Sequence, residues 1–448
     1  MRAILVACLL CLSVAAFAGQ SDALSAGLTA YKAHDYPAAV ADFRRAAEQG
    51  NPAAQAALGV MYDSGHGVPQ DYAKAVKWYR LAARQGIAKA QSNLGVMYDN
   101  GQGVPQDYTK AVKWIRLAAQ QGLADAQFSL GTMYDHGHGV PQDYTKAVKW
   151  IRLAAQQGLA DAQYSLGVMY LRAQGLPQDL GKAAKWLRLA AQLRVAAAQF
   201  GLGMMYESGR GVPQNNFKAV IWLRRAARQG FAPAQYSLGL RYDDGQGVPQ
   251  DYAKAVKWFR LAAQQGFADA QNNLGTMYFK GQGTPRSFAE AAKWYRLAAQ
   301  HGEADAQYNL GAMYHHGQGV TQSYTTALKW YRLAVQQGYA PAEVSLGLMY
   351  VNGQGVPQNY AEAKKWWSFA AQQGDAKAQF NLGAMYDHGQ GVPQDFVEAY
   401  KYFELAKASG DRMETGNMSS LAHSMTPAQI TQAQQEASAW WAAHHKGG

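Results

Sequence analysis

The stretch from Asp125 to Trp150, DAQFSLGTMYDHGHGVPQDYTKAVKW, decides the fold because its pattern returns every 36 residues. Tryptophan marks the period most clearly, since nine tryptophans stand 36 residues apart, from Trp78 to Trp366. A Leu-Gly pair recurs ten times in the same frame. The chain is therefore a tandem array, which must be recognised before domains are counted from length.

Each unit contains two helical patterns joined by a loop. Ala126 and Leu130 follow at the spacing of one helix face. Gly131 lies inside that helix, where glycine costs about 1 kcal/mol relative to alanine, so we expect a neighbouring helix too close for a β-carbon. The Gly-x-Gly-Val-Pro loop ends the helix; Asp143 is a good N-cap for the second helix, and Gly158 stands where a left-handed glycine ends one. Every unit is predicted to be an αα-hairpin, which buries its apolar face only when stacked on another.

The composition fits a packed array and excludes other classes of protein. Charged residues make up 16% of the 448 residues, against roughly 25% in typical globular proteins, and the net charge is +11. With 48% hydrophobic and 12% aromatic residues, the chain has enough apolar surface to fold, which argues against disorder. Outside the N-terminus, no apolar run reaches the ~18–20 residues that a membrane span needs. Length alone suggests about three domains, but the continuous period replaces them with one array.

The N-terminal segment has the features of a secretory signal peptide. Arg2 precedes an apolar run, and small residues around Ala18 form a cleavage site, so residues 1–18 are predicted to be removed. Cys8 and Cys11 lie inside this segment, so the mature chain would contain no cysteine. An alternative is a lipoprotein cleavage site before Cys8. Either way we expect export, to the periplasm or outside the cell.

The pattern Ala-Gln-x-x-Leu-Gly-x-Met-Tyr-x-x-Gly-x-Gly-Val-Pro-x-Asp-x-x-Lys-Ala-x-x-Trp resembles the Sel1-like repeat, a relative of the tetratricopeptide repeat. The resemblance implies an all-α fold, a right-handed α-solenoid, and a protein-binding scaffold of bacterial envelope processes or the eukaryotic secretory pathway. It covers residues 51–410 as ten repeats. Residues 19–50 resemble a tetratricopeptide-like cap. Residues 411–448 are expected to form capping helices, one from Thr426 to about Trp441, and a frayed tail.

One junction departs from the repeat pattern. Ala173 replaces a loop glycine, and Leu193-Arg194 replaces the usual Gln-Gly helix stop. We expect the helix ending near Leu193 to run on or to cap differently, which would bend the array between Leu171 and Gln199.

No catalytic or metal-binding constellation emerges from the sequence. Ser-x-x-Lys, Gly-x-Ser-x-Gly and His-Glu-x-x-His are all missing, so we predict no enzyme activity, no catalytic residue and no cofactor. Some cysteine-rich Sel1-like proteins are penicillin-binding or β-lactamase-like, which remains a remote alternative. The pairs His136/His138 and His315/His316 are too few to supply the ligands of a zinc site, so solvated loop histidines and no metal are expected.

In tetratricopeptide-type solenoids the first helix of each hairpin lines a concave groove, and the resemblance implies the same here. The predicted partner-binding residues are the aromatic anchors, amides and carboxylates of this helix: Phe128, Tyr164, Phe200, Tyr236, Tyr308, Phe380, Asn93, Asn273, Asn309, Asn381, Asp99, Asp135 and Asp243. In the alternative interpretation the aromatic rings pack against the next repeat. The tryptophans have two interpretations as well, inter-repeat core or a glycan-stacking strip, and we favour the core.

Basic residues recur on the second helix, at positions such as Lys74, Lys77, Arg80 and Arg84. Residues 1–224 carry 23 basic and 14 acidic residues, against 19 and 17 in residues 225–448. The positive charge therefore gathers on the N-terminal half of the expected convex surface, where an anionic glycan or a membrane surface is an alternative ligand. With a signal peptide we expect no nucleic acid partner, and we expect a monomer whose main partner is a protein or peptide.

Overall fold

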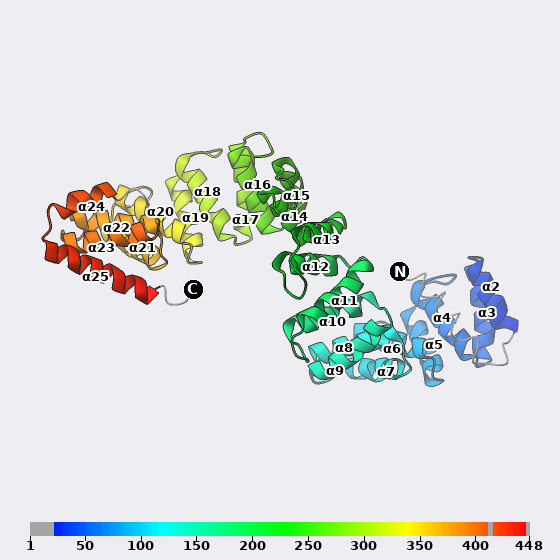
Figure 1. Ribbon diagram of the computed structural model, residues 1–448. Helices are drawn as coiled ribbons and strands as arrows, with labels where there is room; N and C mark the ends of the chain where they lie inside the picture. The colour runs from blue at the N-terminus through cyan, green and yellow to red at the C-terminus, as the bar shows by residue number, and fades with distance from the viewer. Residues whose placement is uncertain (1–21, 411–414, 445–448) are drawn as a thin grey trace. The chain divides into compact units, whose positions relative to one another are not determined.

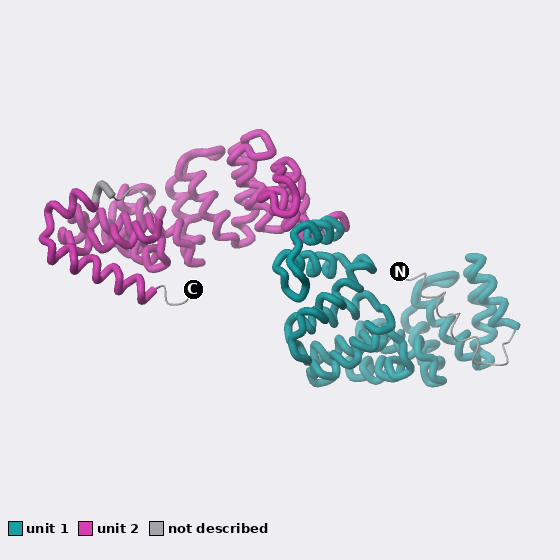
Figure 2. Tube along the Cα trace, viewed as in Figure 1, with its two compact units in different colours: residues 1–226 teal, residues 227–448 magenta. Residues whose placement is uncertain are grey.

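The computed structural model describes residues 22–410 and 415–444, and all regular structure within them is helical, as predicted (Figure 1). The expected signal peptide and the last four residues lie outside the described residues. The chain divides into two compact units, residues 1–226 and 227–448, with the division inside α13 (Figure 2). None of the described helices combines the length and the hydropathy that a membrane span requires.

Up to α23, each compact unit is a succession of hairpins in which an even-numbered helix, here called the first helix, is followed by an odd-numbered second helix. The helices up to the division are α2 (Asp22–Lys32), α3 (Tyr36–Glu48), α4 (Pro52–Ser64), α5 (Tyr72–Arg84), α6 (Ala88–Asn100), α7 (Tyr108–Gln120), α8 (Ala124–His136), α9 (Tyr144–Gln156), α10 (Ala160–Arg172), α11 (Leu180–Gln192), α12 (Ala196–Ser208) and α13 (Asn216–Arg228). Those after it are α14 (Ala232–Asp244), α15 (Tyr252–Gln264), α16 (Ala268–Lys280), α17 (Phe288–Gln300), α18 (Ala304–His316), α19 (Tyr324–Val335), α20 (Ala340–Asn352), α21 (Tyr360–Gln372), α22 (Ala376–His388), α23 (Phe396–Ala408), α24 (Thr415–Ala422) and α25 (Pro427–His444).

The helix ends follow the predicted chemistry. The Asp143 side chain accepts a hydrogen bond from the backbone N–H of Lys146 and caps α9. Gly137 ends α8 with a φ of 74°, in the left-handed region, and Gly158 follows α9 with a φ of 89°. These local signals set the helix length, which is 13 residues in both α8 and α9.

Two glycines of each 36-residue repeat let neighbouring segments of backbone approach one another. A β-carbon on Gly131 would lie 2.5 Å from Cγ1 of Ile151, in the second helix of the same hairpin. This confirms the prediction of a close helix crossing. A β-carbon on Gly139 would lie 2.4 Å from the carbonyl oxygen of Tyr108, so each loop rests on the start of the preceding second helix.

A buried glutamine ties consecutive hairpins together. The side-chain amide of Gln127, which is 5% exposed, donates to the carbonyl oxygen of Ala119 at 3.2 Å, at the end of the preceding second helix. Its Oε1 accepts from Nε2 of Gln157, just after the second helix of its own hairpin, at 2.8 Å. The same side-chain pair recurs as Gln55–Gln85, Gln91–Gln121, Gln235–Gln265 and Gln307–Gln337. A polar bridge of this kind fixes where each first helix lies, because the side chain of the first-helix glutamine is buried and needs its hydrogen-bond partners.

The irregular junction keeps the regular backbone. Helix α11 ends at Gln192, and Arg194 takes a φ of 67° in place of glycine. The N–H of Arg194 donates to the carbonyl of Ala191, and the N–H of Val195 donates to the carbonyl of Ala190. The corresponding hydrogen bonds occur at this position in other repeats. The prediction that this helix runs on or caps differently was wrong, because Arg194 adopts the left-handed conformation that glycine has in other repeats and the turn keeps the same backbone hydrogen bonds. The expected bend rested on that change, and the helix bounds give it no support.

The junction does lack one bridge. Leu193 stands where most other repeats have glutamine, and the buried Oε1 of Gln163 has no hydrogen-bond partner within the described residues. An unsatisfied buried acceptor costs about 1–3 kcal/mol. This repeat is therefore less well tied to its neighbours than those with a complete glutamine pair.

Restoring the missing donor tests this account. We expect Leu193→Gln to raise the free energy of unfolding by about 1 kcal/mol, because the new amide can donate to Oε1 of Gln163. Urea denaturation followed by circular dichroism measures the change. Leu193→Ser removes the same exposed apolar side chain without reaching Gln163, and an equal gain in that variant would contradict the bridge.

The C-terminal helix closes the last hairpin. Helix α25 begins at Pro427, close to the predicted start, and packs against α23, where Ala433 and Phe403 belong to one buried cluster. Thr426 and Gln429 form a reciprocal capping box: the N–H of Thr426 donates to Oε1 of Gln429, and the N–H of Gln429 donates to Oγ1 of Thr426. An end helix of this kind covers the apolar face that a further repeat would otherwise bury.

Candidate functional site

Each predicted aromatic anchor packs partly against other side chains and is partly exposed to solvent. Phe128, Tyr164, Phe200, Tyr236, Tyr308 and Phe380 lie on the first helices α8, α10, α12, α14, α18 and α22, and each is half-buried. The ring centre of Tyr308 lies 5.8 Å from that of Tyr331, and Phe380 lies 5.6 Å from Phe403, in the second helix of the same hairpin. The alternative interpretation, in which the rings pack against helices, accounts for part of each ring. The remaining part faces solvent on what we call the first-helix face, the registers of Phe128, Ser129 and Thr132.

The predicted amides are also half-buried, at Asn93, Asn273, Asn309 and Asn381. Nδ2 of Asn309 donates to Oδ1 of Asn272 at 3.2 Å, which joins the first helices α18 and α16. Burial raises the pKa of Tyr236, and a hydrogen bond with Asn273 opposes this shift. At least two of the amides therefore serve contacts within the fold.

The predicted carboxylates differ from one another. Oδ1 of Asp135 accepts from Nε2 of Gln174 at 2.8 Å and so fastens the loop of the next hairpin. Burial and the nearby charge of Asp244 raise the pKa of Asp243. Asp99 is half-buried, and its backbone carbonyl accepts from Nε2 of Gln106.

The sequence analysis missed an aliphatic row on the same face. In the register of Thr132, Val96 on α6 and Leu348 on α20 are each 40% exposed. Val168, Met204 and Leu240 occupy the same register and are half-buried. Apolar residues recur at this position of the repeat, and that recurrence is the sequence signal from which the row could have been predicted. Exposed apolar side chains in series are typical of a protein-binding surface.

The basic residues of the second helices are largely engaged within the molecule. Nζ of Lys146 lies 3.0 Å from Oδ2 of the capping residue Asp143, and hydrogen bonds from Lys146 lower the pKa of that carboxyl. The same ion pair recurs as Lys74–Asp71, Lys110–Asp107, Lys182–Asp179 and Lys254–Asp251. In the register of Arg80, Arg116 donates to the hydroxyl of Tyr134 in the next first helix at 3.1 Å. The charge of the Lys74 register is therefore largely balanced by carboxylates, whereas the arginines keep their charge and are held in place by tyrosine hydroxyls.

The tryptophans lie at the edge of the core rather than in it. Trp150 is half-buried and packs against a buried cluster, whereas the next residue, Ile151, is 1% exposed. Nζ of Lys149 lies 5.7 Å from the centre of the Trp150 ring, within the range of a cation–π interaction. One part of the Trp150 ring therefore packs against the core, as favoured from the sequence. The Lys149 ammonium group lies near the ring as well.

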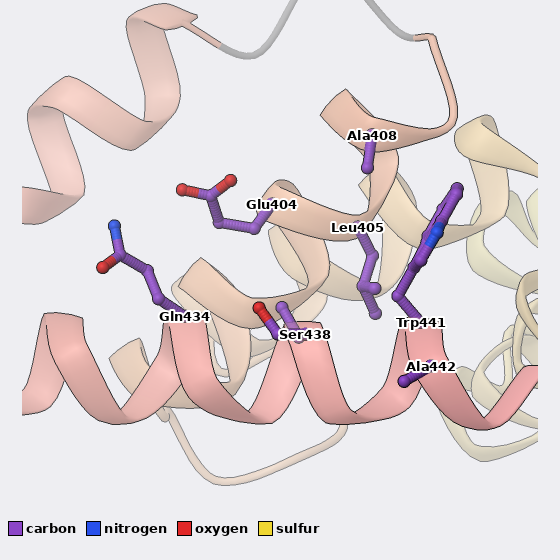
Figure 3. A pocket seen from close by; sticks show the side chains of 8 residues that line it. Glu404, Leu405, Ala408, Gln434, Ser438, Trp441 and Ala442 are labelled. Carbon is purple, nitrogen blue, oxygen red and sulfur yellow. The ribbon is translucent and has the colours of Figure 1, made fainter.

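The histidines and the cavity beside α25 offer little chemistry. Across residues 22–410 and 415–444, no group of three His, Cys, Asp or Glu side chains is placed to hold a metal ion. A cavity of about 480 Å³ lies between α23 and α25, with Leu405 and Trp441 on its walls (Figure 3). Glu404 is the one ionisable side chain of its lining. This cavity marks the seam between the last hairpin and the end helix.

Comparisons with known proteins agree with the repeat geometry. A family model described as the Sel1 repeat matches residues 23–51, 52–87, 88–123, 124–159, 160–194, 196–231, 232–267, 268–303, 304–339, 340–375 and 376–411. The first match covers the segment that we assigned to a tetratricopeptide-like cap, so the family model counts that hairpin as a repeat. A search of curated proteins finds no match.

Two solved structures are similar over most of their length. One is a protective antigen of uropathogenic Escherichia coli strains with an SLR fold; it is 37% identical, covers 94% of this chain and 91% of its own, and has a TM-score of 0.89. The other is a Sel1 repeat protein from Oxalobacter formigenes; it is 34% identical, covers 73% of this chain and 94% of its own, and has a TM-score of 0.56. Both support an α-solenoid built from hairpins.

Proposed function

Because the chain belongs to the Sel1 repeat family, we propose that it is a non-enzymatic scaffold that binds a protein or peptide partner on its first-helix face. Proteins of this repeat type generally serve as scaffolds. Export also belongs to this proposal, since residues 1–18 have the pattern of a signal peptide.

The exposed aliphatic row carries this proposal. Val96 and Leu348 keep 40% of their surface in solvent although they lie on helices whose neighbouring positions are buried. Half-exposed aromatic rings stand in the adjacent register, so apolar anchors and polar amides share one face. Interfaces of moderate size use this mixture, with apolar anchors surrounded by hydrogen-bonding groups.

The alternative, an anionic glycan or membrane surface bound by the second helices, has weaker support. The Lys74 register is paired with the capping aspartates, and the Arg80 register is hydrogen-bonded to tyrosine. The Lys77 register remains, with about one lysine per hairpin. A surface that binds polyanions ordinarily gathers more free charge than this.

A charge placed on each face separates the two proposals. We expect the double variant Val96→Lys/Leu348→Lys to lose a captured protein partner about tenfold or more, because a lysine there would have to be desolvated in the interface. The matched control is Leu117→Lys/Leu333→Lys, on the second helices α7 and α19, where the leucines are 37% and 40% exposed. Capture from a cell-envelope extract on the immobilised chain, quantified by mass spectrometry, measures the difference.

The control should retain the same protein at the wild-type level. Loss in the control but not in the first-helix variant would contradict the proposal. Recovery of carbohydrate alone, released at ~0.3 M salt where charges are strongly screened, would favour the second-helix alternative instead.

A further inference from the structure

The second unit has an aromatic surface flanked by carboxylates. Its residues lie at or near the starts of α16, α18 and α20, three successive first helices that are labelled in Figure 1. We call it the acidic aromatic patch, and it consists of Phe267, Asp269, Glu303, Asp305, Tyr308 and Tyr339, all half-buried. The ring centres of Tyr308 and Tyr339 lie 5.6 Å apart. The hydroxyl of Tyr339 donates to Oδ1 of Asp305 at 2.5 Å, so ring and carboxylate are held side by side.

The carboxylates of this patch repel one another. Burial raises the pKa of Glu303, and the nearby charges of Asp269 and Asp305 raise it further. None of the three forms an ion pair with a lysine or arginine of the described residues. In the first unit one carboxylate of the register of Asp269 is paired, since Nζ of Lys89 lies 3.2 Å from Oδ2 of Asp125.

A favourable helix N-terminus explains only part of this arrangement. Asp269 and Asp305 lie in first turns, where a negative charge is stabilised. Glu303 adds a third charge in a register that is apolar in most hairpins, as at Leu123, Leu159 and Phe267. The polar residues Asn51 and Asp375 in this register cap their helices, whereas Glu303 makes no capping hydrogen bond. A repulsion added where the fold uses apolar residues indicates a role outside the packing of the helices.

The aromatic rings extend the surface beyond the charges. The ring centre of Tyr236 lies 5.2 Å from that of Phe267, two hairpins before the Tyr308–Tyr339 pair. Each ring leaves part of its surface in solvent. Tyrosine and phenylalanine rings attract cations, and they also hold the aliphatic stems of long basic side chains.

We infer that the acidic aromatic patch receives lysine or arginine side chains from an extended basic segment of the protein partner. The inference rests on the proposed function and specifies the chemistry of the partner at this position. Charge complementarity selects this occupant, because the carboxylates lack cations of their own and the rings supply apolar contact. The bound cation would relieve the repulsion around Glu303.

The test uses the full chain and a labelled twelve-residue peptide of alternating lysine and alanine. We expect fluorescence anisotropy at 50 mM NaCl to show binding that weakens about tenfold or more in Asp269→Asn/Glu303→Gln/Asp305→Asn, since charge-assisted contacts are lost. The control Asp22→Asn/Glu48→Gln/Asp161→Asn removes the same charge from exposed positions of the first unit and should change affinity less than about twofold. Thermal melts should show that the patch variant is folded and no less stable, because its repulsion is gone.

Three results would overturn the inference. They are equal loss in both triple variants, equal binding of a glutamate–alanine peptide, and calcium alone stabilising the wild type but not the patch variant. The last would mean a metal occupant. If the patch variant still captures the partner that Val96→Lys/Leu348→Lys loses, the inference fails and the proposed function stands. If neither variant affects capture, the proposed function itself fails.

Discussion

Gly103→Ala is expected to lower the free energy of unfolding by about 3 kcal/mol or more, through steric overlap and an unfavourable backbone conformation. A β-carbon on Gly103 would lie 2.4 Å from the carbonyl oxygen of Tyr72 and 2.7 Å from the nitrogen of Ala73. Both are backbone atoms at the start of α5 and cannot rotate away. The φ of Gly103 is 69°, which L-residues rarely adopt.

Gly122→Ala separates these two causes. Gly122 has a φ of 90°, but a β-carbon added there would meet no atom within 4 Å. We expect this control to lose only about 1 kcal/mol, the conformational cost of the left-handed region. Guanidinium denaturation of both variants measures the difference. Equal losses would mean that the loop does not rest on the preceding hairpin.

Gly131→Ala is expected to lower the free energy of unfolding by about 2 kcal/mol, although alanine is the better helix former. Its β-carbon would lie 2.5 Å from Cγ1 of Ile151 and 3.1 Å from the nitrogen of the same residue. The side chain can move only a little, because Ile151 is 1% exposed. The helix pair must then separate, which removes apolar contacts along α8 and α9.

A helical glycine with free space should respond with the opposite sign. The nearest atom to a β-carbon on Gly201, in α12, is Cδ1 of Leu187 at 3.6 Å, an ordinary contact. Gly201→Ala is expected to raise the free energy of unfolding by roughly 0.5–1 kcal/mol through helix propensity. Chemical denaturation of the two variants under identical conditions measures both signs. Stabilisation by Gly131→Ala would contradict the close crossing.

The fold could be predicted because its signals are local and repeated. The cap at Asp143, the loop glycines and the close crossing at Gly131 each follow from a few neighbouring residues, and repetition reduces the chance of error. Leu193-Arg194 shows where this reasoning fails. The local stop signal is missing there, yet packing by neighbouring hairpins holds Arg194 at a φ of 67°. Tertiary contacts override a single unfavourable conformation of about 1–2 kcal/mol.

The candidate site was less predictable because exposure depends on contacts beyond one helix. Whether the Tyr308 ring faces solvent is set by Tyr331 and Tyr339, which come 23 and 31 residues later. The sequence identified the face and the aromatic register, and those residues remain a prediction as binding residues. Glu303 was not predicted because it is an exception in a mostly apolar register. A repeat pattern selects the residues that recur, so it does not identify such exceptions.

The contacts between hairpins allow whole repeats to be gained or lost by genetic recombination. The 20 residues from Tyr108 to Gln127 are identical to those from Tyr144 to Gln163. The glutamine pairs span 30 residues, and the arginine–tyrosine hydrogen bonds span 18. A recombination event that removed residues 108–143 would therefore join Asp107 to Tyr144 and recreate the same chemistry at the new boundary. The gene can lengthen or shorten by whole 36-residue modules, so the number of first helices can vary among descendants without a change in the contacts between neighbouring repeats.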